Sequence, residues 1–82
     1  MKEVQIKKWS NDMNGDDLTN WFTYHSPTPE HLPKYEKLRK SGKALAEAIL
    51  DNAPACADQT AAVRKVREAV MTANAAIACG GK

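Results

Sequence analysis

A tyrosine–histidine pair and a short cluster of cations are the residues of this 82-residue chain whose types and spacing could do chemistry. The pair is Tyr24 and His25, and the serine nearest to the imidazole, Ser26, is adjacent in sequence and cannot be aimed at that ring as nucleophilic catalysis requires. The carboxylates are scattered, and no glycine-rich phosphate-binding motif occurs. We therefore expect a binding protein and not an enzyme, with no catalytic residue.

The cations gather within ten residues, where Glu36 is the one acidic side chain among them; they are Lys34, Lys37, Arg39, Lys40 and Lys43. Arginine and lysine neutralise phosphate, and aromatic or guanidinium faces stack on nucleobases. This pattern favours a site for an anion that carries flat rings. The candidate ligand-binding residues are Tyr24, His25, Arg39, Lys40 and Lys43.

The charge pattern alone leaves other interpretations open. A run of cations is often a solvated helix face. The face over residues 34–43 could also bind nucleic acid or a protein partner, although a net charge of +2 is small for a protein that binds DNA generally. Strong salt dependence and a preference for polynucleotides would support that alternative.

Metal and membrane functions find no support in the sequence. Cys56 and Cys79 are isolated, and both histidines lie far from them, whereas a zinc site needs four such ligands at closer spacing. No apolar run approaches the roughly 20 residues of a membrane-spanning helix. We expect no metal, no cofactor, no membrane segment and free thiols in a reducing cytosol.

The elements that position the candidate residues begin with an N-terminal arm and a stiff leader. Asn14 or Asp16 can cap a short helix that ends at Trp21. Two prolines then favour an extended leader over residues 22–29. Thr28 can cap the irregular turn that follows this leader.

Two long helices follow the leader. The first is expected to start at Pro33 and to end at Asp51–Pro54. The second is expected to begin with Asp58 as its N-cap and to run to about Cys79, before Gly80-Gly81 stops it.

Each of these helices carries an apolar stripe at helical spacing. The first stripe is Tyr35, Leu38, Leu45, Ala46 and Ile49, with Gly42 where the stripe passes; the second is Val63, Val66, Val70, Ala73 and Ile77. Arg67 and Asn74, seven residues apart, lie together at one edge of the second stripe. The pattern predicts an all-α fold, a helical hairpin.

Size predicts that this hairpin does not act alone. A domain of this length buries only about 60% of its unfolded surface, so a monomer is marginal. We expect a compact homo-oligomer. The predicted organisation is an N-terminal arm over residues 1–21 and a single ligand-binding and oligomerisation domain over residues 22–82.

Several of these features resemble one family, the phage anti-CBASS sponges, which are small helical proteins that sequester the cyclic oligonucleotide messengers of bacterial immunity. The resemblance covers roughly residues 22–79. It rests on Phe22-Thr23-Tyr24-His25 with a proline two positions on, on Tyr35, on Leu38-Arg39, and on Ala73-Asn74-Ala75-Ala76-Ile77-Ala78.

The resemblance implies a hexamer that binds cyclic dinucleotides at sites shared by two protomers, without hydrolysing them, in the cytoplasm of an infected bacterial host. The dinucleotide-contacting tyrosine of the family falls on Tyr24, and its basic partner falls on Arg39 or on the neighbouring Lys40. Some members also bind cyclic trinucleotides at separate sites. Where the family often has a basic residue after the alanine-rich tail, this chain has Cys79.

Overall fold

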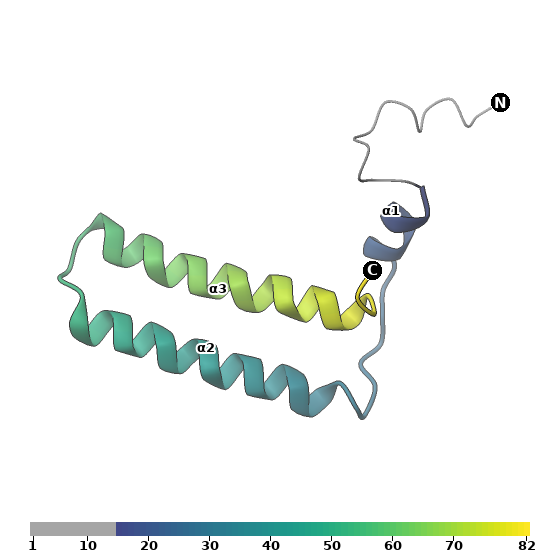
Figure 1. The fold of residues 1–82 in the computed structure, drawn as a ribbon, viewed down its shortest axis with the longest axis horizontal. Coiled ribbons are helices and arrows are strands. Elements are labelled where there is room, and N and C mark those ends of the chain that lie inside the picture. The colour runs from purple at the N-terminus through teal and green to yellow at the C-terminus, as the bar shows by residue number, and fades with distance from the viewer. Residues whose placement is uncertain (1–14) are drawn as a thin grey trace.

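The computed structural model describes residues 15–82, and this part of the chain forms three helices and no strand: α1 (Gly15–Trp21), α2 (Leu32–Asn52) and α3 (Ala57–Ala78). In Figure 1, α2 and α3 lie side by side and antiparallel, and α1 lies beside the C-terminal end of α3. The predicted all-α class and the hairpin are confirmed. Asn14 lies outside the described residues, and Asp16 is the second residue of α1 rather than its cap.

The start of α2 is set by Thr28 and by a proline in the first helical turn. The Thr28 hydroxyl accepts a hydrogen bond from the His31 N–H at 3.3 Å, and the Thr28 carbonyl accepts bonds from the His31 and Leu32 N–H groups at 2.9 and 3.2 Å. These bonds close the predicted turn before the helix. The helix itself begins at Leu32, one residue before the predicted start at Pro33, because a proline is tolerated in the first turn, where its missing N–H leaves no bond unmade.

A glutamine fixes the short connection between the long helices. Gln59 donates from its Nε2 to the carbonyls of Ala53 at 2.9 Å and Leu50 at 3.5 Å, so the first turn of α3 is bonded to the end of α2. The prediction that Asp58 is the N-cap was wrong. Cys56 takes that position with extended backbone and no side-chain bond, and Asp58 lies within the first turn, where a carboxylate is favourable to the helix dipole.

Two glycines end α3, as predicted. Gly80 and Gly81 have φ of 69° and 80°, values that a side chain disfavours. The Gly81 N–H bonds the carbonyl of Ala76 at 2.9 Å, and the Gly80 N–H bonds that of Ile77 at 3.1 Å. These two bonds make a Schellman cap, which satisfies the last carbonyls of the helix.

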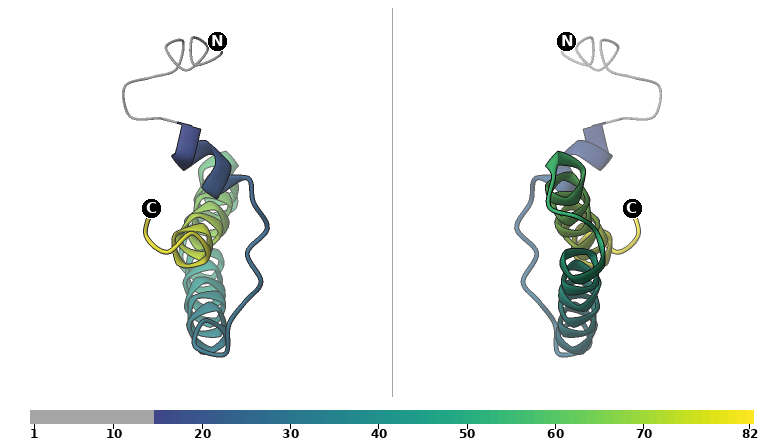
Figure 2. Two further views of the ribbon diagram at one scale, coloured as in Figure 1. Left: turned by 90° about the vertical axis from the view of Figure 1, so that its right-hand side faces the viewer. Right: turned by 90° about the vertical axis from the view of Figure 1, so that its left-hand side faces the viewer.

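The C-terminal end of α3 also anchors α1. The Asn20 amide donates to the carbonyl of Cys79 at 3.3 Å, and the Trp21 indole N–H donates to that of Lys82 at 3.0 Å. Viewed along the hairpin, the leader runs down one side and the C-terminal tail leaves on the other (Figure 2). The leader therefore connects α1 to the start of α2, and both lie at the same end of the hairpin.

The helices meet along the predicted stripes, with one exception. The half-buried residues of α2 include Tyr35, Leu38, Gly42, Ala46 and Ile49, and those of α3 include Val63, Val66, Val70, Ala73 and Ile77. Leu45, which was predicted to belong to the first stripe, is 54% exposed, because it stands at the outer border of the face that Gly42 centres.

The helices approach each other closely at Gly42. This close approach does not create a buried core. A Cβ atom at that position would lie 2.6 Å from Cγ2 of Val70, so a side chain there would collide with α3. Even so, no residue between positions 15 and 82 is fully buried. A two-helix layer leaves every side chain with one face in solvent. None of the described helices is long and apolar enough to cross a membrane.

Candidate functional site

A groove of about 370 Å³ runs along one side of the hairpin, between α2 and α3. Half-buried residues of the two stripes form its floor: Gly42, Ala46, Val63, Val66 and Val70. Its rim is more polar and comes from both helices: Arg39 and Lys43 on α2, and Arg67, Met71 and Asn74 on α3. The groove therefore combines an apolar surface with three cations.

The electrostatics of this groove are one-sided. No acidic side chain of residues 15–82 lines it. Lys43 lies 3.9 Å from Glu47, a weak pair on the exposed surface, and neither Arg39 nor Arg67 has an ion pair within residues 15–82. Three positive charges thus face one space without a counter-charge inside it. An anion that also carries a flat, weakly polar ring could place its charge against the cations and its ring against the apolar floor.

Asn74 supplies an uncharged polar group to the same groove. Its Oδ1 atom is buried and has no hydrogen-bond partner among the described residues. Buried polar atoms of native proteins are nearly always bonded, so this acceptor is left unsatisfied by residues 15–82 of the single chain.

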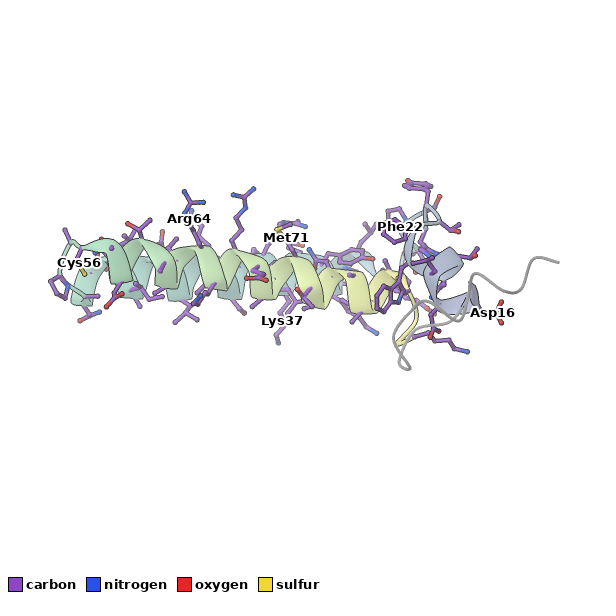
Figure 3. The ribbon with its side chains drawn as sticks, turned by 90° about the horizontal axis from the view of Figure 1, so that it is seen from above. Asp16, Phe22, Lys37, Cys56, Arg64 and Met71 are labelled. Carbon is purple, nitrogen blue, oxygen red and sulfur yellow. The ribbon has the colours of Figure 1, made fainter. Side chains whose placement is uncertain are left out.

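The predicted cation cluster does not act as one surface. Lys40 lies outside the groove, where its Nζ is 3.3 Å from the Glu36 carboxylate, beside Lys37. Figure 3 shows Lys37 on the opposite side of the hairpin from Met71, which lines the groove. Of the two positions that the sequence left open, Arg39 lines the groove and Lys40 does not.

Tyr24 projects from a backbone that is anchored on both sides. The Thr23 hydroxyl donates to the carbonyl of Thr19 in α1, and the His25 Nε2 donates to the carbonyl of Asn20 at 2.8 Å. The Tyr24 side chain itself is 81% exposed and does not line the groove of its own chain. His25 is half-buried and holds the leader to α1. The structure thus places Tyr24 and His25 together, apart from the groove that Arg39 and Lys43 line.

An apolar cavity of about 550 Å³ borders the groove on the outer face of α3. Trp21, Phe22 and Met71, which are 49%, 82% and 59% exposed, contribute to it. Met71 lines both spaces, so the apolar surface runs from the groove to the start of the leader. Apolar side chains are thus exposed at this end of the hairpin.

Sequence reasoning assigned no function to Arg67 and Asn74. Their signal was present, because residues seven apart share one edge of a helix. The sequence does not show which edge of the apolar stripe faces the groove, because that depends on how the partner helix packs against the stripe.

Residues 14–78 match the family described as Acb2/Tad1, hairpin domain. The chain belongs to the Acb2/Tad1 hairpin family. This is the family of anti-CBASS sponges, which are cyclic-nucleotide-binding proteins rather than enzymes. No curated protein and no solved structure matches the chain significantly.

The Acb2/Tad1 match takes in α1 as well as the hairpin, and so begins earlier than the resemblance over residues 22–79. It ends with α3. Within residues 15–82 no group of three or more histidine, cysteine, aspartate or glutamate side chains could hold a metal ion. Because it combines cations with an apolar floor, the groove is the candidate site for the cyclic nucleotide that the family binds.

Proposed function

We propose that this Acb2/Tad1 protein binds and sequesters cyclic dinucleotides without degrading them, and so blocks activation of CBASS immune effectors. As a phage-encoded sponge it acts in the cytoplasm of the infected bacterial host. The observation that carries the proposal is the α2–α3 groove, where Arg39, Lys43 and Arg67 surround an apolar floor and no carboxylate of the described residues lines it. A cyclic dinucleotide offers phosphates to the cations and base faces to the floor.

The size of the groove supports a shared site. Pockets for small molecules measure about 300–1,000 Å³, and this groove, at about 370 Å³, lies near the lower limit. It suits one phosphate with one base rather than a whole cyclic dinucleotide. Two protomers related by a two-fold axis provide two such grooves, which fits the approximate two-fold symmetry of the ligand.

Tyr24 completes this site from the partner protomer. Its phenol is exposed on an anchored backbone and does not line its own groove. In a two-fold assembly each tyrosine reaches the other protomer's groove, where its hydroxyl donates to a phosphate. The lack of any fully buried residue between positions 15 and 82 supports such assembly, and we place the chain in a homohexamer.

Calorimetric titration with a panel of cyclic di- and trinucleotides tests the proposal, with a single-stranded polynucleotide as the comparison. We expect the tightest binding for a cyclic dinucleotide, at one ligand per two chains. A cyclic trinucleotide that binds in addition would mark a second site, as in some members of the family. Binding of the polynucleotide alone, with a loss of about tenfold or more for a modest rise in salt, would overturn the proposal in favour of a nucleic-acid-binding protein.

A further inference from the structure

We propose that Arg67 of α3 is a phosphate-binding residue, so that both helices of the hairpin hold the same phosphate. This inference rests on the proposed function and extends it, because the binding residues predicted from the sequence lie only on the leader and on α2. The groove brings together Arg67 with Arg39 and Lys43, across the line where the two helices meet.

The geometry of two antiparallel helices produces this arrangement. Arg39 and Lys43 are four residues apart and share one edge of α2, and Arg67, Met71 and Asn74 follow one edge of α3 at the same kind of spacing. Both edges line one groove. A ligand seated on the apolar floor therefore has cations on two opposite sides, and a phosphate there can be bonded from both.

The chemistry of Arg67 suits it to this task. Arg67 has no ion pair within the described residues, so its guanidinium is not engaged in holding the fold. A guanidinium donates two parallel hydrogen bonds to a phosphate, whereas an ammonium such as that of Lys43 acts as a point charge. Met71, one turn further along α3, offers its thioether to the base beside that phosphate.

Arg39, Lys43 and Arg67 also repel one another in the empty protein, because Lys43 alone of the three has an ion pair among the described residues, and that pair is weak. A bound phosphate offsets that repulsion, and loss of one cation lowers it. A structural arginine would show the reverse, because its removal would lower the melting temperature of the ligand-free protein. The melting temperature without ligand therefore separates a binding role of Arg67 from a structural one.

Arg64 provides a matched control on the same helix. It carries the same charge, it lies on the same side of the hairpin as Met71 (Figure 3), and it does not line the groove. A diffuse electrostatic effect would make Arg64→Gln and Arg67→Gln equally harmful. A specific contact would make only the second harmful.

The experiment is calorimetric titration of the full chain and of Arg67→Gln, Arg67→Lys and Arg64→Gln with cyclic di-AMP and cyclic di-GMP, together with thermal melts of each ligand-free protein. We expect Arg67→Gln to weaken binding at least tenfold, Arg67→Lys to weaken it less, and Arg64→Gln to stay within twofold of the unaltered chain. The ligand-free melting temperature of Arg67→Gln should equal or exceed that of the unaltered chain.

Equal affinities of Arg67→Gln and Arg64→Gln, measured where the unaltered chain binds, would overturn the assignment of Arg67 and leave the proposed function standing. A lowered ligand-free melting temperature of Arg67→Gln would assign Arg67 a structural role instead. Absence of binding by the unaltered chain to every cyclic nucleotide of the panel would overturn the proposed function itself.

Discussion

We expect Arg39 to contribute more to the affinity for a cyclic dinucleotide than any other single residue. It lines the groove, and its aliphatic stem can lie along the apolar floor while its guanidinium stays at the rim. Arg39→Ala should weaken cyclic dinucleotide binding by about 2 kcal/mol or more, since a two-fold site loses the contact twice. Calorimetry measures this loss, and helix content by circular dichroism should not change.

Two lysines on the same helix serve as controls for Arg39. Lys37 points to the far side of the hairpin, and Lys40 is paired with Glu36 outside the groove. Lys37→Ala and Lys40→Ala should each cost well under about 1 kcal/mol of binding free energy. Losses from Lys37→Ala as large as those from Arg39→Ala would mean that the cations act only as a diffuse charge. A costly Lys40→Ala with a silent Arg39→Ala would move the ligand contact by one residue and contradict the groove geometry.

Tyr24 is the corresponding residue of the leader. Tyr24→Ala should also weaken cyclic dinucleotide binding by about 2 kcal/mol or more, because a phenol that contacts phosphate is lost from both halves of the site. Tyr24→Phe separates the hydroxyl from the ring, and we expect it to lose most of the same affinity. The leader should persist in both variants, since Thr23 and His25 make its bonds to α1. Unchanged affinity in Tyr24→Ala would exclude the leader from the site.

At the scale of the elements, the approach of α2 to α3 at Gly42 holds the groove in shape. Alanine in mid-helix is normally about 1 kcal/mol more stable than glycine. Here its Cβ would lie 2.6 Å from Val70, and overpacking of this kind costs about 1–3 kcal/mol. Gly42→Ala should therefore lower the melting temperature.

The neighbouring exposed position gives the control for Gly42. Ser41→Ala should leave the melting temperature equal or slightly higher, because alanine is the better helix former and nothing is crowded there. Val70→Ala combined with Gly42→Ala should recover part of the loss by removing the colliding methyl group. A Gly42→Ala protein that melts higher than the unaltered chain would show that the helices are free to move apart.

Much of this architecture could be predicted from the sequence, because it depends on local signals. Helical spacing of apolar residues predicted both long helices, and Gly80-Gly81 predicted the end of α3. The N-cap of α3 was misplaced because Asp58 is an equally good first-turn residue. Leu45 was misplaced because its partner face depends on how α3 packs around Gly42, and that packing is not local.

Some residues of the candidate site could also be predicted from local sequence patterns, and others could not. Arg39 and Lys43 were predicted from the charge cluster on one helix, which is a local pattern. Arg67 joins them only because two helices far apart in sequence pack with one particular rotation about their axes. Side-chain spacing on one helix says nothing about that rotation, so the α3 half of the groove required the structure.

At the scale of the whole molecule, the hairpin lacks a core of its own. No residue in the described part of the chain is fully buried, and the large apolar side chains that remain exposed include Trp21, Phe22, Leu45, Leu50 and Met71. Light scattering should report an assembly well above the 9.0 kDa of one chain, with a hexamer as the expected state. A clean monomer at micromolar concentration would exclude the site shared between protomers.

The proposed function requires that the protein retains a cyclic dinucleotide and leaves it intact. The most direct measurement is equilibrium dialysis of the protein against excess cyclic dinucleotide, followed by heat denaturation and chromatography of what is released. We predict one retained ligand per two chains, all of it recovered in cyclic form, because the proposed site binds phosphates and bases and the anti-CBASS sponges are binding proteins. Retention of no ligand, or linear product in amounts that exceed the protein, would contradict it.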